Sequence, residues 1–323
     1  MAYPLTYVVI INWNGKEVLR KCLTTFLVNT KGPNCRLIIV DNASTDGSIA
    51  MLQENFPHIQ LIKNKANMGF SIANNQGIKI ALANGAKQVL LLNNDIEITD
   101  NKWLETLTEI LESDPKIGIV GCKLLYPDGT IQHAGGVIKL RGAYHRGDRE
   151  KDVGHYDQVQ FVDYVTGAAL LIKAKVIREI GLLDEGFSPI YWEDCDWCVR
   201  ARLYGYKIAY TPKPALIHHC GKDTAKFGSI KKYFIIRKST IRFILLNFQL
   251  KDIAKRLVLF ETKAAMACIV GRNHKGPLPF SLRSDASIRL TLFVNEWLPS
   301  IRDLKGIIVL RRQRFMFGEK LNL

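Results

Sequence analysis

The sequence predicts an α/β fold in which a mostly parallel, doubly wound sheet is followed by a basic, mainly helical C-terminal extension. The first observation is that apolar, β-branched runs alternate with helical patterns, as in parallel sheets that are buried on both faces. The second is the charge distribution: residues 1–223 hold 25 Lys and Arg against 24 Asp and Glu, whereas residues 224–323 hold 20 against 6. We therefore expect a balanced domain over residues 1–222 and a basic region over residues 223–323 that meet different partners.

The balanced domain begins with strands and helices in strict alternation. Apolar runs predict strands over residues 7–11, 37–40, 59–62 and 89–92. Helical patterns are predicted over residues 16–28, after the capping residues 44–47, over residues 70–83 and over residues 103–111. Gly85 follows the third of these helices as its C-terminal stop.

After residue 115 the pattern becomes less regular. Glycines and prolines separate short β-like pieces, and residues 161–165 and 168–172 are again predicted to be strands. A helix is predicted over residues 192–204, and the charged stretch 141–158 is expected to form a surface loop.

Composition excludes several classes of protein. The chain has 323 residues, of which 47% are hydrophobic and 23% charged, so it is neither disordered nor collagenous. No apolar run reaches the ~20 residues that a membrane span needs, and the first residues lack the pattern of a secretory signal. The seven cysteines have no secretory context, so we expect reduced thiols and a cytoplasmic protein.

Small polar or acidic residues follow each predicted strand of the balanced domain. Asn12 follows the first strand, Asp41 the second, Asn67 lies beyond the third, and Asn93-Asn94-Asp95 follows the fourth. Ligands of open α/β sheets bind at the carboxyl ends of the strands. These residues therefore predict one polar, ligand-binding crevice.

Acidic and imidazole side chains supply the candidate chemistry. Asp95 suits a divalent cation that bridges phosphates, or it belongs to a solvated turn. Glu193, Asp194 and Asp196 provide either a general base or favourable charge at the start of a helix. His218 is either a metal ligand or one of a partly buried pair with His219.

Seven segments occur in an order that resembles the family 2 glycosyltransferases, and they are most similar to the rhamnosyltransferase-like branch that builds surface polysaccharides. They are VVIINWNG, IIVDNASTDGS, NKANMGFSIANNQG, LLLNNDIEI, VTGAALLIKAKVIREIGLLDEGF, YWEDCDW and ALIHH. The resemblance covers about residues 5–222. It implies a GT-A fold with a Rossmann-like sheet, a nucleotide-diphosphate sugar donor, a divalent metal (Mn²⁺ or Mg²⁺), and inversion at the anomeric carbon.

The same resemblance implies roles for individual residues. Asp194 matches the catalytic base, and Asp95 and His218 match the metal ligands. The strict metal motif has an acid where this chain has Asn93, which leaves the metal fewer charged ligands. The residues that would bind the nucleotide or the donor sugar are Asn12, Asp41, Asn67, Asn75, Asn94, Gly167 and Ala168.

The basic region suits an anionic surface. Residues 226–260 mix basic and large apolar side chains, with Lys231, Lys238 and Arg242 at near-helical spacing, as in a helix that lies in a membrane interface. The alternative is ordinary helix packing with solvated cations. Because enzymes of surface-polysaccharide synthesis use lipid-linked acceptors, the resemblance implies a glycan or lipid-linked acceptor and a protein peripheral on the inner face of the cell membrane.

Three hypotheses follow. The first is an inverting, metal-dependent glycosyltransferase. The second is a catalytically silent protein that binds sugar nucleotides or acts as a scaffold, which only Asn93 favours. The third is a nucleic-acid binder that uses the basic region; the balanced domain has no recognisable nucleic-acid module, so no nucleic acid is expected.

Overall fold

The computed structural model describes residues 3–31, 34–219, 229–256 and 303–316. Its main sheet has ten strands, in the order β10-β12-β6-β11-β4-β1-β2-β3, with β5 paired to β12 and β7 paired to β6. The strands are β1 (Thr6–Asn12), β2 (Cys35–Asp41), β3 (Gln60–Lys63), β4 (Gln88–Asn93), β5 (Ile96–Glu97), β6 (Ile117–Leu125), β7 (Ile131–His133), β10 (Gln160–Phe161), β11 (Ala169–Lys173) and β12 (Lys207–His218). A separate hairpin joins β8 (Gly136–Lys139) and β9 (Gly142–His145).

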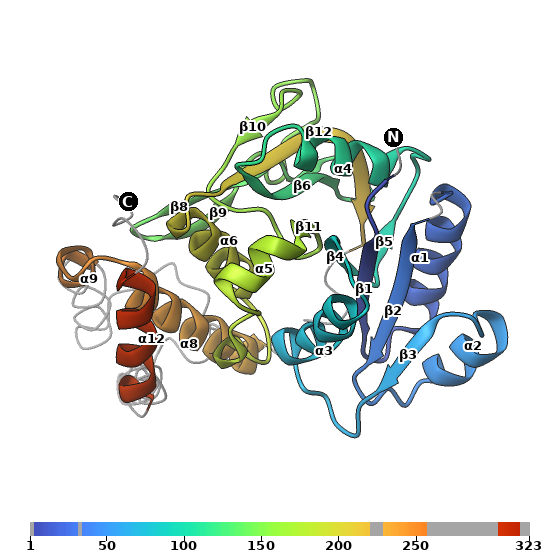
Figure 1. Cartoon of the computed structure of the whole chain (residues 1–323), viewed down its shortest axis with the longest axis horizontal. Helices are drawn as coiled ribbons and strands as arrows, with labels where there is room; N and C mark the ends of the chain where they lie inside the picture. Colours follow the sequence, from blue (N-terminus) through green and yellow to red (C-terminus); the bar gives the residue numbers. More distant parts are fainter. Residues whose placement is uncertain (1–2, 32–33, 220–228, 257–302, 317–323) are drawn as a thin grey trace.

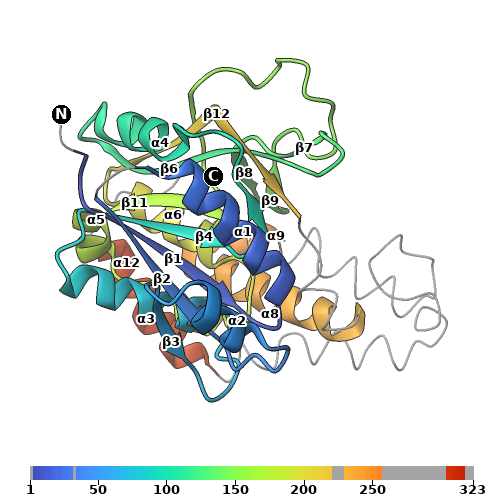
Figure 2. The same ribbon diagram turned by 90° about the vertical axis from the view of Figure 1, so that its right-hand side faces the viewer.

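Helices cover both faces of this sheet (Figures 1 and 2). One face packs against α1 (Lys16–Asn29), α2 (Ser48–Asn55) and α4 (Trp103–Glu112). The other packs against α3 (Phe70–Ala83), α5 (Ala174–Ile180) and α6 (Glu193–Leu203). In β1, Val8 and Ile10 face the first layer while Tyr7 and Val9 face the second, so the strand is buried on both sides. The prediction of alternating strands and helices is confirmed for the first part of the chain.

The sheet becomes mixed beyond β4. Strands β3, β2, β1 and β4 run parallel, whereas β11 lies antiparallel between β4 and β6. Strand β12 then runs parallel to β6 and antiparallel to β5. The predicted mostly parallel α/β sheet is confirmed, and the antiparallel insertion places the start of β11 beside the end of β4.

Two predictions for the middle of the chain are wrong. Residues 141–158 are not simply a loop, because Gly142–His145 forms β9 and pairs with β8. Of the predicted strand 161–165, only residue 161 belongs to a strand. After Val162, which still bonds to Ile208 of β12, the chain turns towards β8: Asp163 accepts a hydrogen bond from the backbone of Ile138, and Tyr164 forms an isolated bridge with Gly136.

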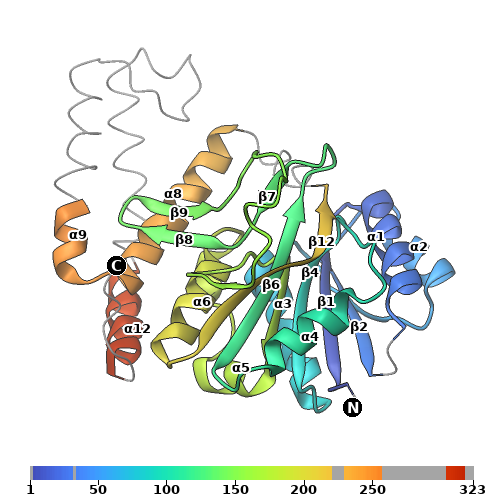
Figure 3. The ribbon, with the colours of Figure 1, turned by 90° about the horizontal axis from the view of Figure 1, so that it is seen from above.

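The C-terminal helices share the core of the balanced domain. They are α8 (Ser229–Asn247), α9 (Leu250–Arg256) and α12 (Leu304–Met316). Phe243 and Phe248 of the α8 segment and Ile307 of α12 belong to the same buried cluster as α5 and α6. Figure 3 shows α8 and α12 together on the side of α6 away from α1 and α2. The predicted boundary at residues 222–223 lies outside the described residues.

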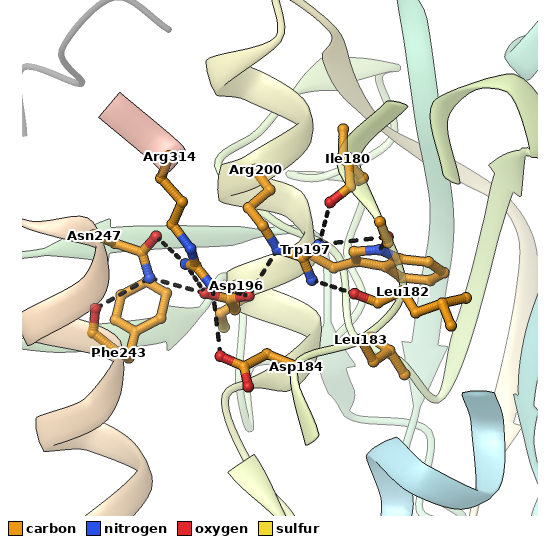
Figure 4. Close-up of polar contacts among 12 residues, drawn as sticks. Ile180, Leu182, Leu183, Asp184, Asp196, Trp197, Arg200, Phe243, Asn247 and Arg314 are labelled. Carbon is orange, nitrogen blue, oxygen red and sulfur yellow. Dashed lines mark hydrogen bonds and ion pairs between the residues drawn. The ribbon is translucent and has the colours of Figure 1, made fainter. Parts of the chain in front are cut away.

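A buried ionic network joins α6 to the C-terminal helices (Figure 4). Asp196 binds Arg200 within α6 at 2.9 Å, Asn247 at 3.0 Å and also Arg314 of α12. Although burial opposes ionisation, the charges of Arg314 and Arg200 hold the pKa of Asp196 below its usual range. This network accounts for one of the three predicted carboxylates as a structural residue.

Two of the three cations that the membrane hypothesis named, Lys238 and Arg242, bind the balanced domain. Arg242 is 7% exposed and binds Asp184 at 2.9 Å, and Lys238 donates a hydrogen bond to the carbonyl oxygen of Ser188. Both side chains therefore face the protein, because acidic and carbonyl oxygens of the balanced domain lie opposite them. The side chain of Lys231 lies outside the described residues. None of the described helices has the length and apolar character that crossing a bilayer needs.

Candidate active site

Buried amides and a carboxylate connect three strand ends. Asn12 donates to Oδ2 of Asp41 at 3.0 Å, and Asn94 donates to Oδ1 of Asn12 at 2.9 Å. Oδ1 of Asp41 accepts the backbone N–H of Ser44. A Cβ on Gly15 would lie 2.6 Å from the Asn94 amide nitrogen, so glycine is required there. This network fixes the ends of β1, β2 and β4; direct contact of Asn12, Asp41 and Asn94 with a nucleotide stays a prediction.

Asp95 and His218 meet at the ends of β4 and β12. The short strand β5 pairs with β12 so that Ile96 lies opposite His218. Nε2 of His218 lies 3.0 Å from Oδ1 of Asp95 and 3.2 Å from the Asn93 amide nitrogen. Oδ1 of Asp95 is buried and accepts no hydrogen bond within the described residues. This unsatisfied oxygen beside an imidazole nitrogen has the chemistry of a divalent-cation site.

Gln132 fixes the orientation of His218. Its Oε1 lies 2.6 Å from Nδ1 of His218, and both residues are buried. Since a carboxamide oxygen only accepts, Nδ1 of His218 carries a proton, so in the neutral ring the Nε2 lone pair faces Asp95. In the described part of the chain, no group of three or more His, Cys, Asp or Glu side chains could hold a metal. A cation here would take its remaining ligands from substrate and water, as Mg²⁺ commonly does.

Asp194 lies at the start of α6. Its Oδ2 accepts the backbone N–H of Gly167 at 2.9 Å, and its Oδ1 accepts that of Cys195. The two residues before Glu193 have left-handed backbones, with φ of 84° at Tyr191 and 77° at Trp192. Such conformations are rare for bulky side chains and concentrate at functional sites. Asp194 is half-buried and therefore reachable by a substrate.

Contacts from both sides hold this strained segment. The backbone N–H of Phe70 donates to Pro189 at 2.7 Å, and Ser239 of α8 donates to the carbonyl of Ile190. The Trp192 ring packs against Phe243 with centroids 4.5 Å apart. The C-terminal helix α8 therefore helps to place Asp194.

Glu193 differs from its two acidic neighbours. It is 4% exposed and its Oε2 has no hydrogen-bond partner among the described residues. Burial, reinforced by the charge of Asp194, raises the pKa of Glu193 well above its usual range. Of the three carboxylates, Asp196 is structural and Glu193 is held neutral by burial, which leaves Asp194 as the carboxylate that is accessible at the crevice.

Gly167 and Ala168 lie between the two acidic centres. A Cβ on Gly167 would lie 3.5 Å from Cβ of Asp194 and 3.3 Å from the Phe70 ring. The carbonyl of Ala168 accepts the backbone N–H of Asn93 at 2.9 Å. The segment thus connects Asp194 to the strand that leads to Asp95, where the sequence predicts contact with the donor sugar.

The remaining two predicted residues have local partners. Asn67 is exposed, and its Oδ1 accepts the backbone N–H of Gly69 in the turn before α3. Asn75 is buried, and its amide exchanges two hydrogen bonds with the backbone of Leu183. We assign both residues to positioning the chain, and their contact with a nucleotide stays a prediction. His219 pairs with Glu97 at 2.8 Å and not with Asp95.

Three residues near the site, Gln132, His133 and His145, could not be recognised from the sequence. Gln132 and His133 are adjacent in β7, so their side chains point to opposite faces. In the sequence, these residues stand out only as two polar side chains after Ile131, and this does not identify their distant partners.

Comparisons with known proteins show what this chain is similar to. Residues 7–166 match Glycosyl transferase family 2. The O-antigen biosynthesis protein RfbC of Myxococcus xanthus is 31% identical over 63% of this chain and 16% of its own length. The dTDP-rhamnosyl transferase RfbF of Shigella flexneri is 24% identical over 75% of this chain and 79% of its own length. The N-acetylglucosaminyl-diphospho-decaprenol L-rhamnosyltransferase of Mycobacterium tuberculosis is 23% identical, over 68% and 77%.

Solved structures agree on the fold. The mannosyltransferase PcManGT of Pyrobaculum calidifontis, in complex with GDP-Man and Mn²⁺, matches with a TM-score of 0.57 at 16% identity, over 98% of this chain and 88% of that one. GalNAc-T7 with UDP, GalNAc and Mn²⁺ matches with a TM-score of 0.60 at 14% identity, over 94% of this chain and 58% of that one.

The lengths of the relatives differ widely. The chain spans 16% of RfbC and 24% of an uncharacterized protein of Sinorhizobium fredii that is 30% identical to it. The match to the family extends from β1 into the segment before β11, and includes Asn12, Asp41 and Asp95. The chain has a GT-A-like fold and belongs to glycosyl transferase family 2, among its rhamnosyltransferase-like members.

Proposed function

We propose that this protein is an inverting, metal-dependent glycosyltransferase of surface-polysaccharide or glycoconjugate synthesis. It moves a sugar from a nucleotide-diphosphate donor to a glycan or lipid-linked acceptor. The observation that carries the proposal is that Gly167 binds Asp194 while the adjacent Ala168 binds the strand end that leads to Asp95 and His218. A leaving-group site and a base on opposite sides of a sugar are what inversion requires.

Asp95 and His218 would hold the cation. Both lie at the carboxyl edge of the sheet, and the unsatisfied Oδ1 of Asp95 fits a cation that shares its shell with phosphate oxygens. The Mn²⁺ in the two solved glycosyltransferases supports Mn²⁺ or Mg²⁺ here. When bound, such an ion acts as a Lewis acid that stabilises the charge of the departing diphosphate.

Asp194 would activate the acceptor. Its carboxylate takes the proton of the attacking hydroxyl as the bond from that oxygen to the anomeric carbon forms. The bond from the anomeric carbon to the diphosphate breaks at the same time, and its electron pair leaves with the nucleoside diphosphate. The N–H of Gly167 holds one carboxylate oxygen in place, which fixes the direction of proton transfer.

The names of the relatives support a deoxyhexose donor and a lipid-linked acceptor. RfbF is named for dTDP-rhamnose, and the mycobacterial relative for an N-acetylglucosaminyl-diphospho-lipid. We therefore propose a dTDP-rhamnose-like or UDP-sugar donor.

We further propose that the protein is peripheral on the cytoplasmic face of the membrane and contacts anionic lipid through its C-terminal region. In α12, Lys305, Ile308, Val309 and Arg312 recur at helical spacing and are all exposed. Two branched apolar side chains between two cations suit an anionic interface. This stripe replaces Lys238 and Arg242 as the candidate contact.

A thermal-shift screen tests the proposed function. Ligands that bind the folded state raise its apparent stability by mass action. Nucleoside diphosphates with thymine, uracil or guanine bases are compared with and without Mn²⁺ or Mg²⁺. The proposal predicts a metal-dependent rise in Tm with dTDP or UDP. No shift with any nucleotide would favour the scaffold hypothesis.

A further inference from the structure

Two imidazoles that the proposed mechanism does not use lie next to the segment that binds Asp194. His133 on β7 is fully buried, whereas His145 at the end of β9 is exposed. Their Nδ1 atoms are 2.6 Å apart, and the rings meet edge to face with centroids 4.7 Å apart. The Tyr164 ring packs against both. The rings of His133 and Tyr164 thus hold His145 in one orientation.

The hydrogen-bond partners define the proton positions of this pair. The backbone N–H of Thr166 donates to Nε2 of His133 at 3.4 Å, so that nitrogen is an acceptor. Burial lowers the pKa of His133 well below its usual value, which keeps the ring neutral. A neutral imidazole that accepts at Nε2 carries its proton on Nδ1. His133 therefore donates to Nδ1 of His145, and neutral His145 carries its own proton on Nε2.

The place of His145 indicates what its Nε2–H could bind. Thr166 precedes Gly167, which binds Asp194. Although His145 as a whole residue is exposed, its ring packs against His133 and Tyr164, and this desolvation lowers its pKa, while the charges of Asp194 and Asp148 oppose the shift. The described residues give Nε2 of His145 no hydrogen-bond partner. This donor is therefore linked, through His133, Thr166 and Gly167, to the carboxylate that must contact the acceptor.

We propose that His145 is an acceptor-binding residue, whose Nε2–H donates to a hydroxyl of the acceptor sugar, and that His133 is a positioning residue that sets its tautomer. The inference rests on the proposed function, since the acceptor side is defined by Asp194 as the base. A neutral imidazole suits a neutral hydroxyl. The anionic diphosphate belongs instead with Asp95 and His218.

The tautomers can be measured without substrate. Long-range ¹H–¹⁵N correlation spectra of the full chain with ¹⁵N-labelled histidine separate Nδ1–H from Nε2–H rings. We expect His133 as the Nδ1–H form and His145 as the Nε2–H form near neutral pH. Substitution of each histidine assigns its signals. The opposite tautomer of His145 would overturn the inference.

Kinetics test the binding role. The probe is a short-chain N-acetylglucosaminyl-diphospho-lipid, with the donor nucleotide sugar that the thermal-shift screen selects. For His145→Ala we expect the KM of the acceptor to rise about tenfold, as loss of one hydrogen bond implies, with the KM of the donor unchanged. His145→Gln restores a donor near Nε2 and should recover much of the loss. His155→Ala, an exposed histidine before β10, is the matched control.

The positioning role has its own variants. His133→Asn keeps a donor for His145 and should retain a low acceptor KM, whereas His133→Leu should raise it and shift the His145 signals. An acceptor KM unchanged in His145→Ala, with wild-type transfer intact, would overturn this inference alone. A wild-type protein that binds no nucleotide and transfers no sugar would overturn the proposed function, and the inference with it.

Discussion

Oδ2 of Asp194 accepts a hydrogen bond of 2.9 Å from the backbone N–H of Gly167, and this contact joins the start of α6 to the segment before β11. The next residue, Ala168, accepts the N–H of Asn93 at the end of β4. The candidate base and the strand that leads to the candidate metal ligand are therefore linked through two adjacent backbone groups. A shift of Asp194 would therefore also shift the end of β4, which leads to Asp95.

Asp194→Asn should abolish turnover and keep nucleotide binding. The amide cannot take the acceptor proton, so kcat should fall by about 10²–10⁴, while the thermal shift with nucleoside diphosphate persists. Glu193→Gln is the matched variant, because Glu193 is already held neutral by burial. Equal losses of kcat in the two variants would refute Asp194 as the base.

Asp95→Asn should remove the metal-dependent part of nucleotide binding. The substitution keeps the size of the side chain but withdraws the charge beside His218. Calorimetric titration of the nucleoside diphosphate with and without Mn²⁺ measures this term. Glu54→Gln, exposed on α2, controls for loss of surface charge. An unchanged metal effect would contradict the assignment of Asp95.

Gln132→Leu should weaken cation binding, although Gln132 is not itself a candidate ligand. The variant loses the acceptor that holds the proton on Nδ1 of His218. Residues that orient metal ligands typically contribute 10–100-fold in metal affinity, so a drop of about that size is expected. Gln132→Glu keeps an acceptor oxygen and should retain affinity. Mn²⁺ titration by electron paramagnetic resonance gives the readout, and equal affinities in the two variants would dismiss the role of Gln132.

Arg314→Met should destabilise the whole fold. It leaves the buried carboxylate of Asp196 without one of its partners, and breaking a buried ion pair costs about 3–5 kcal/mol. Arg312→Met, on the exposed side of the same helix, should leave stability nearly unchanged. Chemical denaturation of both variants gives the free energies of unfolding, and a small loss in Arg314→Met would show that the network contributes little.

Ionisation of Asp196 should contribute to the pH dependence of the free energy of unfolding. Its pKa in the folded state lies below the unfolded value of about 3.9. The ionised form therefore contributes stability above that value, and the contribution is lost as the pH falls towards the lowered pKa. Asp196→Asn should flatten the fall in the free energy of unfolding between about pH 5 and about pH 2. A slope equal to that of the wild type would argue against this group as a source of acid sensitivity.

The exposed stripe of α12 should govern binding to anionic vesicles. Each basic residue near such a surface contributes about 1 kcal/mol, so Lys305→Glu with Arg312→Glu should sharply reduce sedimentation with phosphatidylglycerol vesicles. Lys65→Glu with Lys79→Glu, exposed on the balanced domain, is the control of equal charge. Equal vesicle binding by the two double variants would remove α12 as the contact.

Local patterns in the sequence predict the front of this fold well. Short, β-branched apolar runs around Val9 and Ile39 favour buried strands, and the polar residues after them lie together because parallel strands end at one edge. Helix bounds such as Phe70–Ala83 follow from periodicity and a C-terminal glycine. These signals are local, so a single sequence carries them.

Partners that lie far apart in the chain could not be predicted in this way. Helical periodicity gives Arg242 a place on a helix, but it does not reveal Asp184 opposite it. Gln132 lies in a strand of three residues, and its contact with His218 depends on how β7, β6 and β12 pair. Such contacts are set by the tertiary fold, which also decided which of Glu193, Asp194 and Asp196 faces the crevice.

The most direct test of the central claim is the stereochemistry of transfer. The full chain is incubated with Mn²⁺, the selected nucleotide sugar and the N-acetylglucosaminyl-diphospho-lipid, and the anomeric configuration of the new bond is read by NMR. A single base at Asp194 opposite the leaving diphosphate predicts a product of opposite configuration to the donor. A product that retains the configuration, or no transfer from any nucleotide sugar that binds, would contradict it.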